Sequence, residues 1–190
     1  MSLVMAFSGM SGAVMAGDQR EIFFQGDESR IGILEAELNS NLLRDDEQLR
    51  SRAKDLGIAI AIRDDKCKVT SRDGVLVGEV TETDGPVIKR RRLCVSCGKY
   101  AIIEKTGPEW TVLSRGEGSH FLVLGNEATK AIAYTCIRKL WNPRGGTRED
   151  AVKVLILSMQ EAAKRTASVS SAFSIIQTQT RADVPGASCL

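Results

Sequence analysis

The chain opens with two short apolar runs joined by a glycine-containing turn. Leu3–Phe7 and Ala13–Ala16 are apolar without alternation, and residues 8–12 between them are Ser-Gly-Met-Ser-Gly. Short continuous apolar runs are typical of strands buried on both faces, and a turn of this kind joins two such strands into a hairpin. We therefore predict a buried β-hairpin at the start of the chain.

After the hairpin the pattern changes to alternating helix and strand signals. Residues 28–38 carry apolar side chains at helical spacing, and residues 45–56 begin with acidic residues that suit a helix N-terminus. Residues 58–62 and 75–80 are rich in β-branched side chains and are flanked by polar turn material. We interpret residues 25–85 as a compact α+β insertion.

The rest of the chain predicts further strands and a pair of helices. Thr147, with Asp150 three residues later, has the pattern of a helix N-cap. Residues 86–180 are expected to form one core with residues 2–24, and residues 181–190 are expected to be a mobile tail. The expected elements are strands at 87–98, 99–104, 110–114 and 173–177, and helices at 126–141 and 147–164.

Candidate chemistry gathers directly after Met1. Ser2 is small, so removal of Met1 is expected to leave its free α-amine beside its own hydroxyl. An α-amine has a pKa of about 7.7–8.0, which makes it a usable base near neutral pH. Asp18 and Arg20 follow the second run and should lie beside the start of the first, because hairpin strands return in space. These residues predict a nucleophile, its base and charged supporting groups at one end of the hairpin.

This opening resembles the start of proteasome β subunits and other N-terminal-nucleophile hydrolases. With the insertion after residue 24, the basic run Lys89–Arg92 and the turn Gly116–Ser119, the chain is similar over nearly its whole length to the Connectases, proteasome-related protein ligases of methanogenic archaea. The resemblance implies an α+β fold, an αββα-type N-terminal-nucleophile sandwich shortened by the loss of two helices. It also implies that the insertion recognises substrate; a structural cap over an exposed sheet face is the alternative.

The family pattern includes an essential lysine that points at the nucleophile from a core strand. Period-two alternation places four residues on one side of the strand at 87–98: Lys89, Arg91, Leu93 and Val95. In the family strand, core residues follow the lysine two and four positions later, and this pattern favours Arg91. The distance to the Gly98 turn favours Lys89, so the choice stays open. A basic run of this kind also suits a solvated face or a phosphate contact.

Two further segments resemble parts of the family's site. Glu117 and Ser119 lie in a turn similar to the family's Gly-Ser-Gly-Ser turn, which packs under the nucleophile, although Glu117 stands where that turn has a serine. An exposed acid in a tight turn is the alternative interpretation. Thr166 and Ser168 resemble the loop that supports the α-amine, with Thr166 in place of the expected aspartate.

The resemblance implies protein ligation as the function. Connectases act on a Lys-Asp-Pro-Gly-Ala motif found in the methanogens' membrane-bound methyltransferase, and they join the part ending in aspartate to an amine that begins with proline. The alternatives are a proteasome-like serine peptidase, with Ser2 attacking a peptide carbonyl and water completing the reaction, and a catalytically inactive binding module. A nucleic-acid binder would rest on Lys89–Arg92 alone.

Composition narrows these alternatives. A 43% hydrophobic and 26% charged chain with a formal net charge of +2 is typical of soluble globular proteins and carries no bulk charge that favours nucleic acid. The apolar runs are too short to span a bilayer, so a cytoplasmic location is expected. The protein is also expected to be a monomer. Cys94 and Cys97 could form half of a zinc site, but His120 is the only histidine and no second CxxC follows. No metal or cofactor is expected.

Overall fold

The N-terminal hairpin is the centre of the molecule. The structure, a computed structural model, describes residues 3–84, 87–142 and 144–184. Strands β1 (Val4–Gly9) and β2 (Gly12–Asp18) pair antiparallel from Val4↔Gly17 to Gly9↔Gly12, and every residue in both is buried. The predicted hairpin is therefore confirmed, because its continuous apolar runs are covered on both faces.

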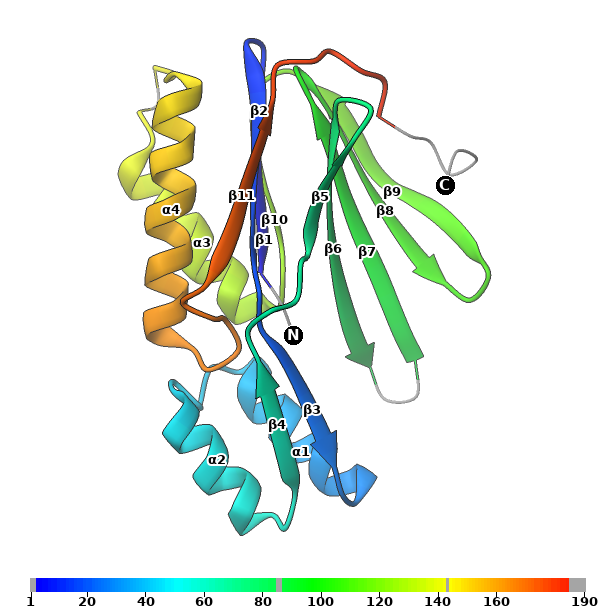
Figure 1. Cartoon of the computed structure of the whole chain (residues 1–190), viewed down its shortest axis with the longest axis vertical. Helices are drawn as coiled ribbons and strands as arrows, with labels where there is room; N and C mark the ends of the chain where they lie inside the picture. Colours follow the sequence, from blue (N-terminus) through cyan, green and yellow to red (C-terminus); the bar gives the residue numbers. More distant parts are fainter. Residues whose placement is uncertain (1–2, 85–86, 143, 185–190) are drawn as a thin grey trace.

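A four-stranded sheet forms around this hairpin in the order β10-β1-β2-β11, with β10 at His120–Leu124 and β11 at Phe173–Thr178. Helices α3 (Glu127–Leu140) and α4 (Arg148–Arg165) cover one face of it (Figure 1). The predicted Thr147–Asp150 capping box starts α4. The core on this face combines the following side chains of strands and helix: Leu3, Met5, Phe7, Val14, Ala16, Val154, Leu155 and Met159.

A five-stranded sheet packs against the other face of the hairpin. Its inner face presents Leu93 and Val95 to Val4 and Met15 of the hairpin, as the predicted alternation along 87–98 requires. The strands are arranged in the order β5-β6-β7-β8-β9, with β5 at Val69–Arg72, β6 at Val75–Asp84, β7 at Val87–Ser96, β8 at Lys99–Thr106 and β9 at Glu109–Glu117.

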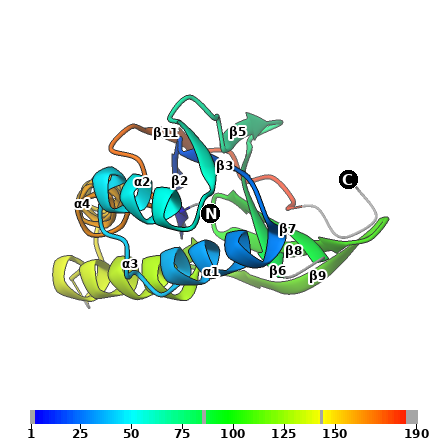
Figure 2. The same cartoon turned by 90° about the horizontal axis from the view of Figure 1, so that it is seen from below.

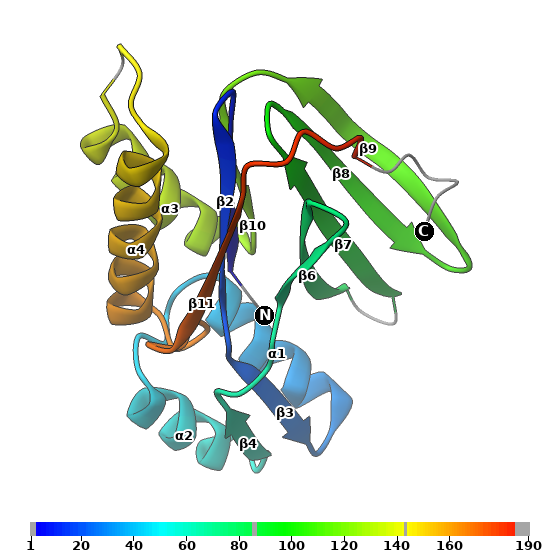
Figure 3. The same ribbon diagram turned by 45° about the horizontal axis from the view of Figure 1, so that its top comes forward.

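Helices cover only one side of this pair of sheets. Within the described part of the chain, the outer face of the five-stranded sheet carries no helix. The chain after β11 crosses to this sheet instead (Figure 3). Ser96 Oγ donates to the carbonyl of Ala182 at 2.6 Å, and Lys99 forms an ion pair with Asp183 at 2.5 Å. Ala182 and Asp183 therefore contact this sheet, and residues 185–190 lie outside the described residues. The mobility expected of residues 181–190 stays a prediction.

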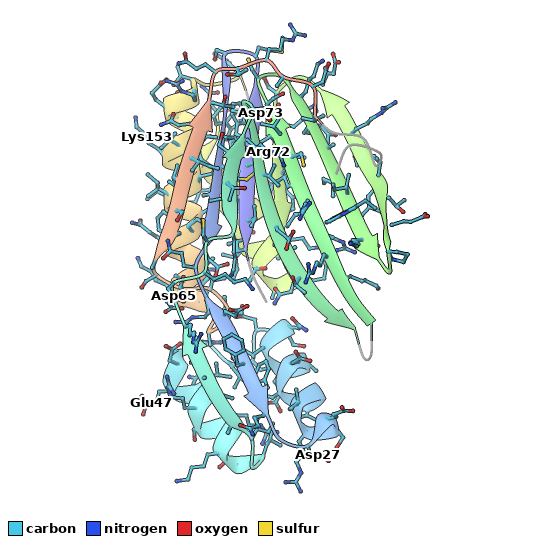
Figure 4. The ribbon with its side chains drawn as sticks, turned by 45° about the vertical axis from the view of Figure 1, so that its right-hand side comes forward. Asp27, Glu47, Asp65, Arg72, Asp73 and Lys153 are labelled. Atoms are coloured by element: carbon cyan, nitrogen blue, oxygen red, sulfur yellow. The ribbon has the colours of Figure 1, made fainter. Side chains whose placement is uncertain are left out.

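The inserted module is shorter than predicted. Strands β3 (Glu21–Gln25) and β4 (Ala59–Arg63) pair with each other, and helices α1 (Glu28–Asn39) and α2 (Asp46–Asp55) lie between them in sequence. Figure 4 shows this unit below the sandwich, with Asp27 and Glu47 near the starts of its two helices and Asp65 where it meets the core. Figure 2, which views the molecule from below, shows α1 and α2 in the foreground.

The module has a small core of its own, whose buried members are Leu34, Leu38, Leu43, Leu49, Ala53 and Ile58, together with Ala167 from the main core. The predicted boundary at residue 85 is wrong, because β5 and β6 belong to the five-stranded sheet. Val69, Leu76 and Val80 from these strands are buried against the hairpin. Among the described residues, no helix is both long enough and apolar enough to cross a membrane.

Candidate functional site

Asp18 closes the hairpin at the end where the chain begins. Its Oδ2 accepts a hydrogen bond from the Leu3 N–H at 2.6 Å, and its own N–H donates to the Leu3 carbonyl at 3.0 Å. Its Oδ1 accepts the Arg20 N–H at 2.8 Å, and the side chain has no exposed surface. The carboxylate is therefore fixed to the residue that follows Ser2. Ser2 itself lies outside the described residues.

The positive partner of Asp18 is Lys68. Its Nζ lies 2.7 and 2.9 Å from the two Asp18 oxygens and 2.6 Å from the Arg20 carbonyl oxygen, with 3% of the side chain exposed. Burial lowers the pKa of the Lys68 ammonium, and the Asp18 charge opposes that effect. Sequence reasoning missed this residue, because its segment has the polar composition of a turn.

Gly17 explains why Lys68 can come so close. A Cβ at Gly17 would lie 2.7 Å from Val69 Cγ1 and 3.4 Å from Lys68 Cβ. The Lys68 carbonyl accepts the Glu79 N–H at 2.9 Å, which ties this segment to β6. The glycine before Asp18 therefore removes the side chain that would keep the lysine segment away from the hairpin.

Arg20 joins the site to the inserted module. Its guanidinium contacts Asp46 at the start of α2 and Asp64 just after β4, and it also donates to the Ala167 carbonyl at 2.8 Å. The Asp64 hydrogen bond is the main cause that raises the pKa of Arg20. The backbone of Arg20 lies beside Asp18, whereas its side chain reaches the module. The expectation that Arg20 lies near Ser2 stays a prediction, because Ser2 is outside the described residues.

Arg91, one of the two cations predicted on β7, has a partner other than Asp18. Arg91 Nε donates to Glu104 Oε2 of β8 at 2.7 Å, and Lys89 is paired in register with Glu82 of β6. The carboxylate of Asp18 is occupied by Lys68. Lys68, which precedes β5, therefore contacts Asp18 where the sequence prediction placed Lys89 or Arg91.

The turn with Glu117 and Ser119 lies at the opposite end of the hairpin. The next residue, His120, pairs with Ser8, whereas Leu124 pairs with Val4 at the start of β1. The two ends are separated by four steps along the strand, from Val4 to Ser8, with a rise of about 3.3 Å per step. The expectation that this turn packs beneath Ser2 is therefore wrong.

The loop after α4 lies at the predicted end of the hairpin. Thr166 and Ser168 are both buried, with their hydroxyl oxygens 2.9 Å apart. Ser170, which sequence reasoning did not single out, accepts the Gln19 N–H on its Oγ at 3.0 Å. Ala172 accepts the same N–H at 3.2 Å. The loop therefore packs against the residue that follows Asp18; the roles of its hydroxyls in catalysis stay predictions.

These groups form a buried acid–base arrangement next to the first strand. The oppositely charged side chains of Asp18 and Lys68 form a buried ion pair, and Asp18 accepts a hydrogen bond from the Leu3 amide. The buried hydroxyls of Thr166 and Ser168 line the neighbouring loop. A lysine of lowered pKa in such a place can hold positive charge beside a reacting amine and hydroxyl or exchange a proton with them. The arrangement therefore suits activation of a nucleophile at the start of the chain.

Comparisons with known proteins give a family match. No curated protein matches the chain. Among solved structures it is similar to Anbu, an ancestral beta-subunit, from Yersinia bercovieri, with a TM-score of 0.42 and 8% identity over 93% of this chain and 80% of that one. It is also similar to Anbu in its helical assembly from Pseudomonas aeruginosa, with a TM-score of 0.42 and 12% identity over 92% and 80%. The family model for the Connectase MJ0548-like N-terminal domain matches residues 1–188. Because that match spans nearly the whole sequence, the chain belongs to the Connectase family.

Proposed function

We propose that this protein is an N-terminal-nucleophile protein ligase, a transpeptidase that acts through Ser2 once Met1 has been removed. The observation that carries the proposal is the buried Asp18–Lys68 pair, which is hydrogen-bonded to the amide of Leu3, the residue after Ser2. Membership of the Connectase family and the two-sheet architecture with helices on one face support the same class of enzyme.

The proposed chemistry needs no group beyond the chain and two peptides. The Ser2 α-amine takes the Oγ proton, Oγ attacks the substrate carbonyl, and the leaving peptide departs as an amine that carries that proton. The new ester then shifts its acyl group to the Ser2 nitrogen through a five-membered ring, which frees Oγ and leaves an amide. The reverse sequence with another peptide amine yields the ligated product. Lys68 supplies positive charge that lowers the proton affinity of the amine.

The proposed substrate is a peptide or protein with the Lys-Asp-Pro-Gly-Ala motif, such as the methyltransferase of methanogens. Its Lys-Asp portion would form the acyl group, and the segment beginning with proline would leave. The inserted module of β3, α1, α2 and β4 is the proposed site of motif recognition. Its strand β3 continues the chain directly from the residues that hold Asp18, which supports this role.

Intact mass spectrometry tests the proposal. The mature protein, with Met1 removed, is mixed with a motif peptide. We expect a mass increase equal to the acyl fragment that resists hydroxylamine, as an amide does, and that is reversed by excess leaving peptide. Ser2→Ala and a form that retains Met1 should give no adduct. Two free peptide fragments with an unchanged enzyme mass would identify a hydrolase, and an unchanged peptide would identify an inactive binding module.

A further inference from the structure

Arg20 carries two sets of contacts that serve different parts of the molecule. Through its backbone it belongs to the acid–base arrangement: the N–H donates to Asp18 Oδ1 at 2.8 Å, and the carbonyl accepts Lys68 Nζ at 2.6 Å. A displacement of the Arg20 backbone would therefore change the geometry of both members of the pair.

Through its side chain the same residue holds the inserted module. Nη1 and Nη2 lie 2.5 and 3.2 Å from the two Asp46 oxygens. Nε and Nη2 lie 2.9 Å from the two Asp64 oxygens, and Nη1 also donates to the Ala167 carbonyl at 2.8 Å. All the nitrogens of the guanidinium are thus engaged, and only 7% of the residue is exposed. A planar fork can hold two carboxylates in this way, whereas an ammonium cannot.

The two carboxylates come from opposite ends of the module's second half. Asp46 is the first residue of α2, and Asp64 follows β4 directly. The Arg20 hydrogen bond is the main cause that lowers the pKa of Asp64, and the Lys68 charge contributes in the same direction. The module is therefore linked to the Asp18–Lys68 pair by hydrogen bonds and by charge.

We propose that Arg20 is a positioning residue that couples the seating of the inserted module to the geometry of the Asp18–Lys68 pair. This inference rests on the proposed function for its kinetic consequence. A module that is held loosely still binds peptide, but the pair beside Ser2 is no longer held in its reactive position. Loss of the side-chain contacts therefore slows acyl transfer more than it weakens peptide binding.

The chain offers both graded variants and a matched control. Arg20→Lys keeps the charge but loses the fork, and Asp46→Asn and Asp64→Asn each weaken one arm of it. The control is Glu37→Gln, because Glu37 and Arg52 form a similar two-oxygen ion pair, with contacts of 2.6–3.1 Å, that lies wholly between α1 and α2. It perturbs the module without touching Arg20.

Two measurements separate coupling from a purely structural role. In single-turnover kinetics with a motif peptide, we expect Arg20→Lys to lower the maximal rate of acyl-enzyme formation by about 10- to 100-fold, the scale of a small misplacement of reacting groups, with little change in the half-saturating peptide concentration. The double variant Asp46→Asn with Asp64→Asn should lower the maximal rate almost as much as Arg20→Lys does. Glu37→Gln should not lower it. An unchanged maximal rate, or a rise in half-saturation alone, overturns the proposal.

The second measurement does not depend on activity. Hydrogen exchange at the Leu3 and Arg20 amides, both of which donate to Asp18, should become faster in Arg20→Lys and Asp64→Asn but not in Glu37→Gln. Unchanged exchange in Asp64→Asn, whose side chain is partly exposed, overturns the coupling even if Arg20→Lys does not fold. If the wild type forms no adduct, the proposed function fails, and hydrogen exchange alone still decides the coupling.

Discussion

Lys68 Nζ lies within 2.9 Å of both carboxylate oxygens of Asp18, in a place where at most 3% of either side chain is exposed. Two opposite charges in that environment stabilise each other only while both are present, because each has given up its hydration. The pair therefore makes the folded state sensitive to the removal of either partner.

The first prediction concerns the stability of this pair. Lys68→Met should lower the free energy of unfolding by about 3–5 kcal/mol, because it leaves Asp18 buried without its counter-charge. The double variant Asp18→Asn with Lys68→Met should recover much of that loss. Urea denaturation provides the measurement. The control is Lys66→Met, which removes a more exposed partner of Glu21 and should cost about 0–1 kcal/mol. Equal losses at the two lysines would contradict the buried-pair interpretation.

The second prediction compares the lysine of the site with the cations of β7. Lys68→Arg keeps positive charge but replaces a compact ammonium with a larger planar guanidinium, which cannot keep the same contacts with Asp18 and the Arg20 carbonyl, so acyl-enzyme formation should fall by about 100-fold or more. Lys89→Gln and Arg91→Gln should change the rate only a few-fold, because Arg91 is engaged with Glu104 on β8. Rates are measured by intact mass in a single turnover. A large loss at Arg91 with none at Lys68 would return the role to β7.

The third prediction follows from the pKa of Asp64, which the Arg20 hydrogen bond holds below its ordinary value of 3.8. A carboxyl with a lowered folded-state pKa stabilises the fold above its unfolded pKa, and this contribution is lost as the pH falls from 3.8 towards the folded-state value. Wild type and Asp64→Asn should therefore differ in unfolding free energy at neutral pH and converge below that window. Denaturation curves across the acid range measure this. The control is Asp65→Asn, a surface substitution at an exposed neighbour, which should change the unfolding free energy at neutral pH by less than about 0.5 kcal/mol.

The fourth prediction tests the packing of the two sheets. A Cβ at Gly78 of β6 would lie 2.4 Å from Val4 Cγ1 and 2.8 Å from Met15 Sδ. Gly78→Ala should therefore destabilise the fold by about 1–3 kcal/mol through overpacking. Gly32 of α1 has nothing within 4 Å of the same position, so Gly32→Ala should instead stabilise it by roughly 0.5–1 kcal/mol. Thermal unfolding of both variants provides the comparison, and a neutral Gly78→Ala would contradict the close approach of the sheets.

Local sequence patterns were sufficient for the elements whose signals lie within a few residues. The hairpin could be predicted because unbroken apolar runs need cover on both faces. Helix α4 could be predicted because Thr147 and Asp150 satisfy the backbone groups of its first turn. The alternation of β7 correctly placed Leu93 and Val95 towards the core. The hairpin also placed Asp18 beside the start of the chain, since strand pairing brings those positions together.

Only the tertiary structure decided which cation serves Asp18. The segment before β5 is polar and short, and nothing local distinguishes a buried Lys68 from a solvated lysine in a turn. Its burial depends on contacts that are distant in sequence: β5 and β6 join the sheet against the hairpin, and Gly17 permits the close approach. Because β5 and β6 belong to the five-stranded sheet, the inserted module ends earlier than predicted. Lys68, and not a cation of β7, pairs with Asp18. The sequence by itself determined the hairpin and its acid, and long-range packing decided which lysine lies beside that acid.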